Sequence, residues 1–97
     1  MESKLINNTT ASRFEIHVDG QIAFIEYVLT DEGTMCLLHT EVPKSLEGKG
    51  YGKILVEETL AYIKSHHYSL APVCRFVSTY VLRHPEWNSL LAEDYNM

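Results

Sequence analysis

A glycine-rich segment, Glu47–Lys53, stands between an apolar strand-like run and a long helical pattern. Its glycines, Gly48, Gly50 and Gly52, occupy alternate positions, so the backbone can approach a ligand without a Cβ in the way. Several N–H groups then converge at the positive end of a helix dipole. The segment therefore predicts a turn from a strand into a helix that cradles a phosphorylated ligand.

Two common nucleotide motifs do not fit this segment. A Walker loop needs a glycine where the chain has Glu47 and a Ser or Thr where it has Ile54. A dinucleotide fingerprint needs a third glycine where the chain has Lys53 or Leu55, depending on the glycine from which it is read. What remains is the pattern x-x-Gly-x-Gly, followed by a helix.

Hydrophobic periodicity predicts an α/β or α+β fold with the element order β-β-β-α-β-α. The expected strands are 13–18, 21–29, 35–42 and 69–74, and the expected helices are 51–65 and 76–82. Asp19-Gly20 is a strong hairpin signal, and Pro72 indicates an edge or bulged strand. Residues 21–29 are apolar on both faces, which predicts a central strand covered on both sides. The last strand is expected to follow a parallel βαβ step.

Length and composition predict one soluble domain spanning residues 1–97. Of its 97 residues, 45% are hydrophobic and 22% are charged. The apolar stretches are far shorter than the ~20 residues of a transmembrane helix, and the N-terminus has no secretory pattern, so we expect a cytoplasmic protein that does not bind membranes. Cys36 and Cys74 are expected to be free thiols. The formal charge of −5 argues against nucleic acid as a partner.

Three segments in this order carry a family resemblance over about residues 13–92. They are His39-Thr40-Glu41-Val42-Pro43 before the glycine segment, then Pro72-x-Cys74-x-Phe76-Val77-x-x-Tyr80, and finally His84-Pro85-Glu86-Trp87. In these segments the chain resembles the minimal, single-domain GCN5-related N-acetyltransferases (GNAT). The resemblance implies a GNAT-like minimal fold, acetyl-CoA as the acetyl donor, and transfer of the acetyl group to an amine acceptor.

The resemblance also implies where acetyl-CoA would lie. Its pyrophosphate would bind the backbone N–H groups of Gly48, Lys49, Gly50, Tyr51, Gly52 and Lys53. Its pantetheine arm would pair with the strand at Leu38, Thr40 and Val42, and its thioester would lie near Cys74. The neighbours of His84-Pro85-Glu86-Trp87 are a further candidate contact for the adenine end, while Trp87 itself is expected to pack against the core.

The chain departs from the family pattern in three respects. Glu47 stands where relatives usually have Gln or Arg, and an acid beside a pyrophosphate weakens binding unless it points away or Lys49 and Lys53 compensate. Arg75 replaces a residue that is often small or Pro. The helices that build an acceptor pocket in larger acetyltransferases are missing.

Cys74 is the main candidate for the chemistry. It stands at a strand end, before a helix and next to Arg75, and both features lower the pKa of a thiol. The thiol could accept the acetyl group covalently or protonate the CoA sulfur, or it could simply be a small buried side chain. His39 is a candidate base toward the amine, and Glu41, on the same strand face, is an alternative base or a carboxylate that attracts cations.

We predict no metal site. Cys36-x-x-His39 has a suggestive spacing, but residues three apart on a regular strand point to opposite faces and cannot close on one ion.

Three functions fit the sequence: an acetyl-CoA-dependent N-acetyltransferase, a non-catalytic acyl-CoA-binding or sensing module, and a protein interaction domain whose glycines only make a tight turn. The sequence leaves the acceptor open among a protein lysine, a polyamine and a small metabolite. It also leaves the oligomeric state open.

Overall fold

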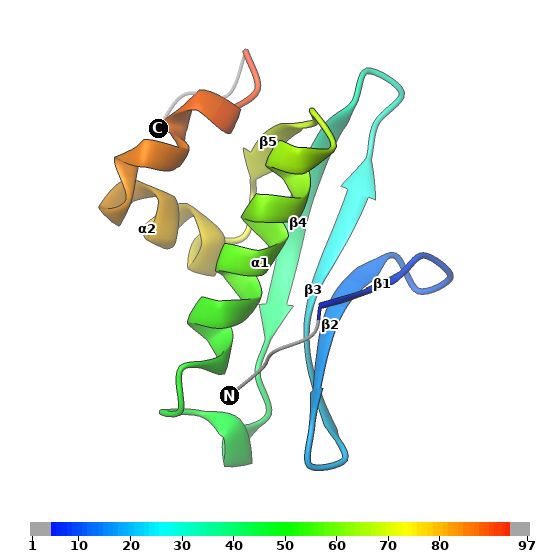
Figure 1. Cartoon of the computed structure of the whole chain (residues 1–97), viewed down its shortest axis with the longest axis vertical. Coiled ribbons are helices and arrows are strands. Elements are labelled where there is room, and N and C mark those ends of the chain that lie inside the picture. Colours follow the sequence, from blue (N-terminus) through cyan, green and yellow to red (C-terminus); the bar gives the residue numbers. More distant parts are fainter. Residues whose placement is uncertain (1–4, 94–97) are drawn as a thin grey trace.

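Within residues 5–93, which the computed structural model describes, the chain forms a five-stranded sheet with helices packed on one of its faces (Figure 1). The elements follow one another in the order β1 (Ile6–Asn8), β2 (Arg13–Val18), β3 (Gln21–Leu29), β4 (Thr34–Glu41), the 3-10 helix η1 (Lys44–Leu46), α1 (Tyr51–Ser65), β5 (Ser69–Pro72), α2 (Arg75–Arg83) and the 3-10 helix η2 (Pro85–Leu90).

The order of strands in the sheet is the order in the chain, β1-β2-β3-β4-β5. The first four strands pair antiparallel, and β4 pairs with β5 in parallel after the crossover through α1. The mixed α/β fold and the parallel step confirm the prediction. The short strand β1 was not predicted.

Local sequence signals explain the turns and the ends of α1. Asp19 and Gly20 both have positive φ, 51° and 76°, as the tight turn between β2 and β3 requires. Helix α1 has the predicted bounds. It ends at Ser65 and is capped by His66, and His67 then adopts the left-handed conformation that terminates helices, with φ 60°.

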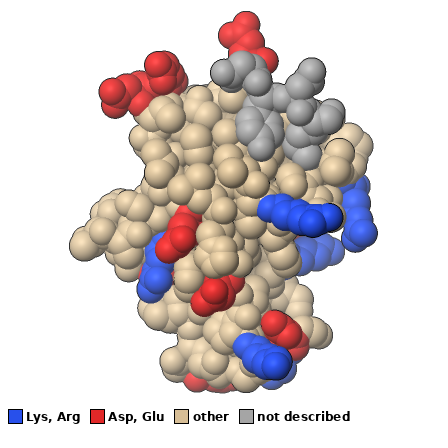
Figure 2. All heavy atoms as spheres, turned by 180° about the vertical axis from the view of Figure 1, so that it is seen from behind, with Lys and Arg blue, Asp and Glu red and all other residues tan. Residues whose placement is uncertain are grey.

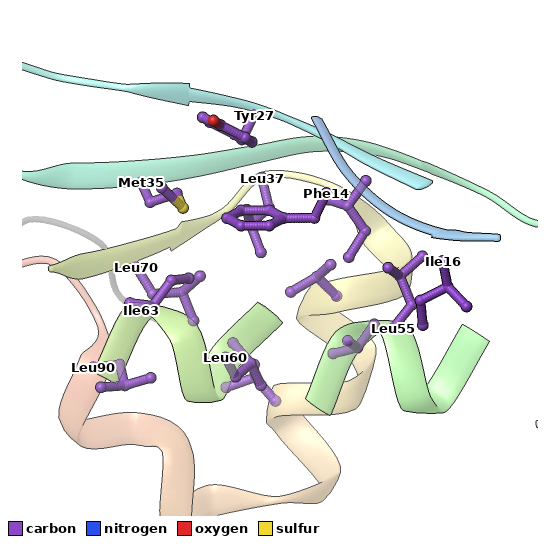
Figure 3. Close-up of a cluster of buried hydrophobic side chains, with 14 of the residues drawn as sticks. Phe14, Ile16, Tyr27, Met35, Leu37, Leu55, Leu60, Ile63, Leu70 and Leu90 are labelled. Carbon is purple, nitrogen blue, oxygen red and sulfur yellow. The ribbon is translucent and has the colours of Figure 1, made fainter. Parts of the chain in front are cut away.

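The hydrophobic core lies between the sheet and the helices (Figure 3). The close-up shows side chains of β2, β3 and β4 facing those of α1, with Leu70 of β5 and Leu90 of η2 closing one end. Phe14, Ile25 and Leu60 are fully buried in it. Helix α2 adds Val77 and Val81, which are equally buried, so both α-helices serve one core.

The prediction that β3 is covered on both faces was wrong. Ala23, Ile25 and Tyr27 face the helices and are buried, but on the other face Phe24 is half-buried and Val28 is 51% exposed. Figure 2 shows the molecule from this side, where no helix lies over the middle of the sheet. We call this side the uncovered face.

The C-terminal elements differ slightly from the predicted bounds. Strand β5 ends at Pro72 because the Val73 N–H turns back to the Ala71 carbonyl oxygen at 2.9 Å. As Pro72 indicated, β5 is an edge strand. Helix α2 stops at Arg83, and Trp87 packs partly buried against the core, as predicted. Within residues 5–93, no helix is long and apolar enough to cross a membrane.

Candidate functional site

The glycine segment connects η1 to α1 through two residues that need a left-handed backbone. Gly48 has φ 79° and Gly50, the N-cap of α1, has φ 82°, a conformation that side chains rarely adopt. A Cβ built on either glycine would meet no atom within 4 Å. Both glycines are therefore required by backbone conformation, and both face open space.

The first turn of α1 offers backbone donors to a ligand. The first backbone bond of the helix runs from the Ile54 N–H to the Gly50 carbonyl oxygen at 3.1 Å, so the amides of Gly52 and Lys53 precede the helical ladder. Within residues 5–93, no side chain caps this terminus, and its first turn contains no acid. The positive end of the helix dipole therefore points toward the glycine segment.

Gly52 also has a role in packing, which was not predicted. A Cβ at Gly52 would lie 2.7 Å from Cζ of the Phe76 ring, which comes from the first turn of α2. The missing side chain thus lets Phe76 seat on α1. Gly52 is therefore needed for packing between α1 and α2.

A pocket of about 440 Å³, here called the loop pocket, opens beside the glycine segment. It is lined by Thr40, Val42, Leu46, Glu47, Gly48, Gly50, Tyr51, Gly52, Lys53 and Phe76. Of the predicted cofactor residues, Leu38 and Lys49 lie outside this lining. Leu46 and Phe76 were not predicted as site residues. Leu46 is nevertheless the only apolar residue between Lys44 and Gly50 in the sequence, a signal that it is anchored in the fold.

Cys74 lies at the junction between the sheet and α2. Its Sγ donates a hydrogen bond to Thr40 Oγ1 at 3.2 Å, and its backbone N–H donates to the Leu37 carbonyl oxygen at 2.8 Å. The pairing of β4 with β5 ends just there, at Leu37 and Pro72. Because Thr40 lines the loop pocket, the thiol lies directly behind the pocket wall.

His39 and Glu41 lie on the uncovered face, not with Cys74. A bulge at Leu38 shifts the register of β4, so that His39 pairs with Glu26 and Glu41 pairs with Phe24. His39 Nε2 lies 3.2 Å from Glu41 Oε1, and both side chains are more than half exposed. They share one strand face, as predicted. The structure therefore brings His39 together with Glu41, but it does not bring either of them onto the side of the sheet where the thiol lies.

A sequence model of the GCN5-related N-acetyltransferases matches residues 13–90. The chain belongs to this family. Its fold is also similar to the solution structure of a protein from Staphylococcus aureus assigned as a GCN5-like N-acetyltransferase, with a TM-score of 0.69 and 22% sequence identity. That match covers 94% of this chain and 87% of the other, and at this identity it shows the shared fold.

Membership of the GCN5-related family supports acetyltransferase activity in general, and members typically use acetyl-CoA. Glu47, the position that departs from the family pattern, lines the loop pocket. Lys53, from the first turn of α1, lines the same pocket and is available to offset that negative charge.

The prediction that Cys36 and His39 point to opposite faces of their strand was wrong. Because Leu38 is bulged, Cys36 pairs with Val28 and His39 with Glu26, and these partners share a face of β3. Cys36 and His39 therefore lie on the same side of the sheet. Within the described residues, however, no group of three or more His, Cys, Asp or Glu side chains is placed to hold a metal ion.

The uncovered face carries a buried carboxylate, Glu15, whose side chain is only 3% exposed. Burial alone would raise its pKa, but hydrogen bonds from His17, Arg13 and Asn8 outweigh that effect and lower the pKa of Glu15 to about 2. The bonds from His17 Nε2 and Asn8 Nδ2 measure 2.7 and 2.9 Å. This cluster joins β1 to β2 and lies apart from the loop pocket, so we assign it to stability.

Proposed function

We propose that this chain is an acetyl-CoA-dependent N-acetyltransferase that binds the pyrophosphate of acetyl-CoA at Gly48–Lys53. The observation that carries the proposal is the loop pocket. It lies between the N-terminus of α1, which no side chain caps among the described residues, and Thr40, whose Oγ1 accepts a hydrogen bond from the Cys74 thiol. A phosphate bound beside Gly48 and Gly50 would accept hydrogen bonds from backbone donors and gain from the helix dipole.

The edge of β4 supports the placement of the pantetheine arm. Beyond Leu37, no residue of β5 pairs with β4 among the described residues. An extended ligand with amide groups can therefore run beside Leu38–Val42, while Thr40 and Val42 contribute side chains to the pocket wall. The thioester end of such a ligand would lie toward Cys74.

Cys74 would act in one of two ways. In the first, its thiolate attacks the thioester carbonyl, the bond between the acetyl carbon and the CoA sulfur breaks, and the amine then attacks the acetylated cysteine. In the second, a neutral amine attacks the thioester directly and the Cys74 thiol gives its proton to the departing CoA sulfur. The N–H bond to Leu37 and the Sγ–H bond to Thr40 hold the thiol in position for either step.

A non-catalytic acyl-CoA-binding module is the second candidate. The separation of Cys74 from the His39–Glu41 pair favours it, because neither of the two predicted bases then lies on the thiol side. The acceptor remains open among a protein lysine, a polyamine and a small metabolite. A cytoplasmic location and a single domain over the whole chain also remain predictions.

Calorimetric titration with acetyl-CoA, with ATP and NAD as controls, tests the proposal. We expect selective, saturable binding of acetyl-CoA. Gly50→Glu should abolish it, because the variant adds a side chain and a negative charge where the pocket is open. Glu47→Gln should tighten it. Equal binding of all three ligands, or unchanged affinity in Gly50→Glu, would rule out the phosphate cradle.

Cys74→Ala separates the enzyme from the module. If the chain is an enzyme that uses this thiol, the variant should keep its affinity for CoA and lose acetyl transfer to a panel of amines. If neither turnover nor affinity changes, the role of Cys74 is wrong. A wild-type chain that binds acetyl-CoA and transfers nothing to any amine supports the module.

A further inference from the structure

The bulge in β4 decides which side chain meets the Cys74 thiol. Before the bulge, Leu37 is fully buried on the face that the helices cover. After it, Thr40 pairs with Ile25, which is fully buried on the same face, so Thr40 lies on that face too. Without the extra residue, the alternation along the strand would place His39 on this face and Thr40 on the other.

We propose that Thr40 is a positioning residue for Cys74. Its hydroxyl holds the sulfur in place while Cys74 is a neutral thiol, and it donates a hydrogen bond to the sulfur when Cys74 is a thiolate. The inference rests on the proposed function, because it names the side chain that prepares the thiol for that reaction. Thr40 acts through Cys74, and the acetyl group need not touch it.

The contact between the two side chains joins distant parts of the chain. Cys74 Sγ donates to Thr40 Oγ1 at 3.2 Å, across 34 positions in the sequence. The backbone of Cys74 is fixed as well, because its N–H donates to the Leu37 carbonyl oxygen at 2.8 Å. Within residues 5–93, the bond to Thr40 is the one hydrogen bond of the Cys74 side chain. Thr40 is therefore the side chain that sets the hydrogen bonding of this sulfur.

A threonine hydroxyl can serve both charge states of a cysteine. It carries one O–H donor and two acceptor lone pairs, and its hydrogen rotates to suit the partner. A neutral thiol is a weak donor, so its bond to Thr40 Oγ1 contributes little. A thiolate would instead accept the Thr40 O–H, and a hydrogen bond to an ionised group is about twice as strong as a neutral one. The balance of the two bonds therefore favours the thiolate.

Helix α2 favours the same charge state. Cys74 is the N-cap of α2, and its carbonyl oxygen accepts a hydrogen bond from the Ser78 N–H at 2.9 Å. The thiol therefore lies at the positive end of the helix dipole, where a thiolate is stabilised. The dipole acts on any cysteine at this N-cap, whereas the hydroxyl donor is available only because the bulge turns Thr40 toward the sulfur.

Packing alone does not require a hydroxyl at position 40. Val42, two residues later, lines the same loop pocket and packs partly buried against the core. Valine has the branched shape of threonine, so it would fill the place of Thr40 without an O–H group. The hydroxyl is accounted for by its bond to the thiol.

The pH dependence of Cys74 alkylation tests the inference. Iodoacetamide reacts with the thiolate, and peptide mass spectrometry follows Cys74 and Cys36 separately. Thr40→Val keeps the branched shape and removes the O–H group. At pH 7 it should slow alkylation of Cys74 about three- to tenfold, and the midpoint of the pH–rate profile should rise by about one pH unit. Thr40→Ser keeps a hydroxyl and should react within about twofold of the wild-type chain.

Thr34→Val is the matched control. Thr34 lies at the other end of β4, where it pairs with Ser69, and it is outside the loop pocket. Its replacement makes the same chemical change on the same strand and should leave the alkylation of Cys74 unchanged. Cys36 is the internal reference and should react at one rate in all the chains. Circular dichroism checks that each variant is folded.

Steady-state kinetics give a second measurement once an amine acceptor is found. Thr40→Val should lower kcat about three- to tenfold, because less of Cys74 is a thiolate. The KM for acetyl-CoA should change less than about twofold, because valine keeps the shape of the pocket wall. A variant that raises KM and leaves kcat unchanged would show that Thr40 contacts the ligand and does not act through the thiol.

The outcomes separate the two proposals. A midpoint that rises in Thr40→Val, with Thr40→Ser and Thr34→Val close to the wild-type chain, supports the inference. An unchanged midpoint overturns it, as does a lower one, which would show that the hydroxyl holds the neutral thiol. Equal effects of Thr40→Val and Thr34→Val also overturn it.

The alkylation assay uses no acetyl-CoA, so a negative result there leaves the proposed function to the calorimetric titration. A chain that passes the alkylation assay and does not bind acetyl-CoA would overturn the proposed function, and the role of Thr40 in that reaction with it.

Discussion

The two faces of the sheet belong to the same strands but are stabilised differently. On the helix-covered face, Phe14, Ile25 and Leu37 are fully buried against α1 and α2. On the uncovered face, Val28 is 51% exposed, and the buried side chain is the carboxylate of Glu15 in its hydrogen-bonded cluster. The difference shows that alternation along a strand defines two faces but does not say how many layers cover them.

The largest expected effect comes from a threonine on the core-facing side of β3, and it is compared with a threonine on the uncovered face of the same strand. Ile25→Thr should lower the free energy of unfolding by about 2–4 kcal/mol, because it removes packing and buries a hydroxyl. Val28→Thr should change it by less than about 0.5 kcal/mol, since the side chain is half exposed and stays β-branched. Urea denaturation measures both. Similar losses in the two variants would mean that another surface covers Val28 in solution.

The second prediction concerns Glu15, a buried side chain on the uncovered face. Glu15→Gln should cost about 1.5–3 kcal/mol at pH 7, because it weakens charge-assisted hydrogen bonds to a side chain that is only 3% exposed. The folded-state pKa, about 2, lies below the ordinary value of 4.5. The stabilisation is therefore fully present above pH 4.5 and is lost as the pH falls toward 2.

Denaturation curves between pH 7 and pH 2.5 check this sign. The wild-type chain should lose stability more steeply than Glu15→Gln below pH 4.5. Parallel curves for the two chains would show that the carboxylate is not held in the folded state by Arg13, His17 and Asn8.

The third prediction concerns Gly52, on the covered side, where only a small net effect on stability is expected. In Gly52→Ala, the gain in helix propensity of about 1 kcal/mol offsets the cost of displacing the half-exposed Phe76 ring. The free energy of unfolding should therefore change by less than about 1 kcal/mol. Acetyl-CoA affinity should nevertheless fall, because Phe76 lines the loop pocket.

A double variant checks the reason. In a Phe76→Ala background the clash is gone, so Gly52→Ala should raise stability by about 1 kcal/mol in thermal or urea unfolding. A loss of stability in that background would place the clash elsewhere.

Patterns that depend on near neighbours in the chain predicted most of the fold. The period and the flanking glycine and histidine residues defined α1 at Tyr51–Ser65, and Asp19-Gly20 defined the hairpin between β2 and β3. Features that depend on distant partners were missed. Strand β1 contains Asn7 and Asn8, which have weak β propensity, and it forms by pairing with β2.

The candidate site was predicted in part. The loop pocket contains most of the residues expected to contact acetyl-CoA. The bulge at Leu38 could not be predicted, because no glycine marks it in the sequence, and it changes which residues of β4 share a face. The pocket along α2, lined by Lys53, Arg75, Phe76, Thr79, Tyr80, Arg83 and His84, did leave a signal. Arg75, Thr79 and Arg83 recur every four residues, as do Phe76, Tyr80 and His84, which places both rows on adjacent helix stripes.

The strands lie in the sheet in the order in which they occur in the chain, and this affects the order in which the strand pairs form during folding. Strands β1 to β4 pair with their chain neighbours through short turns, so the search for these contacts involves small loops. The parallel pair of β4 and β5 must wait for the whole α1 crossover to close, and such non-local contacts form slowly. We therefore expect the antiparallel meander to gain hydrogen-exchange protection first, and the groove between α1 and α2 to be the last part of the protein to fold.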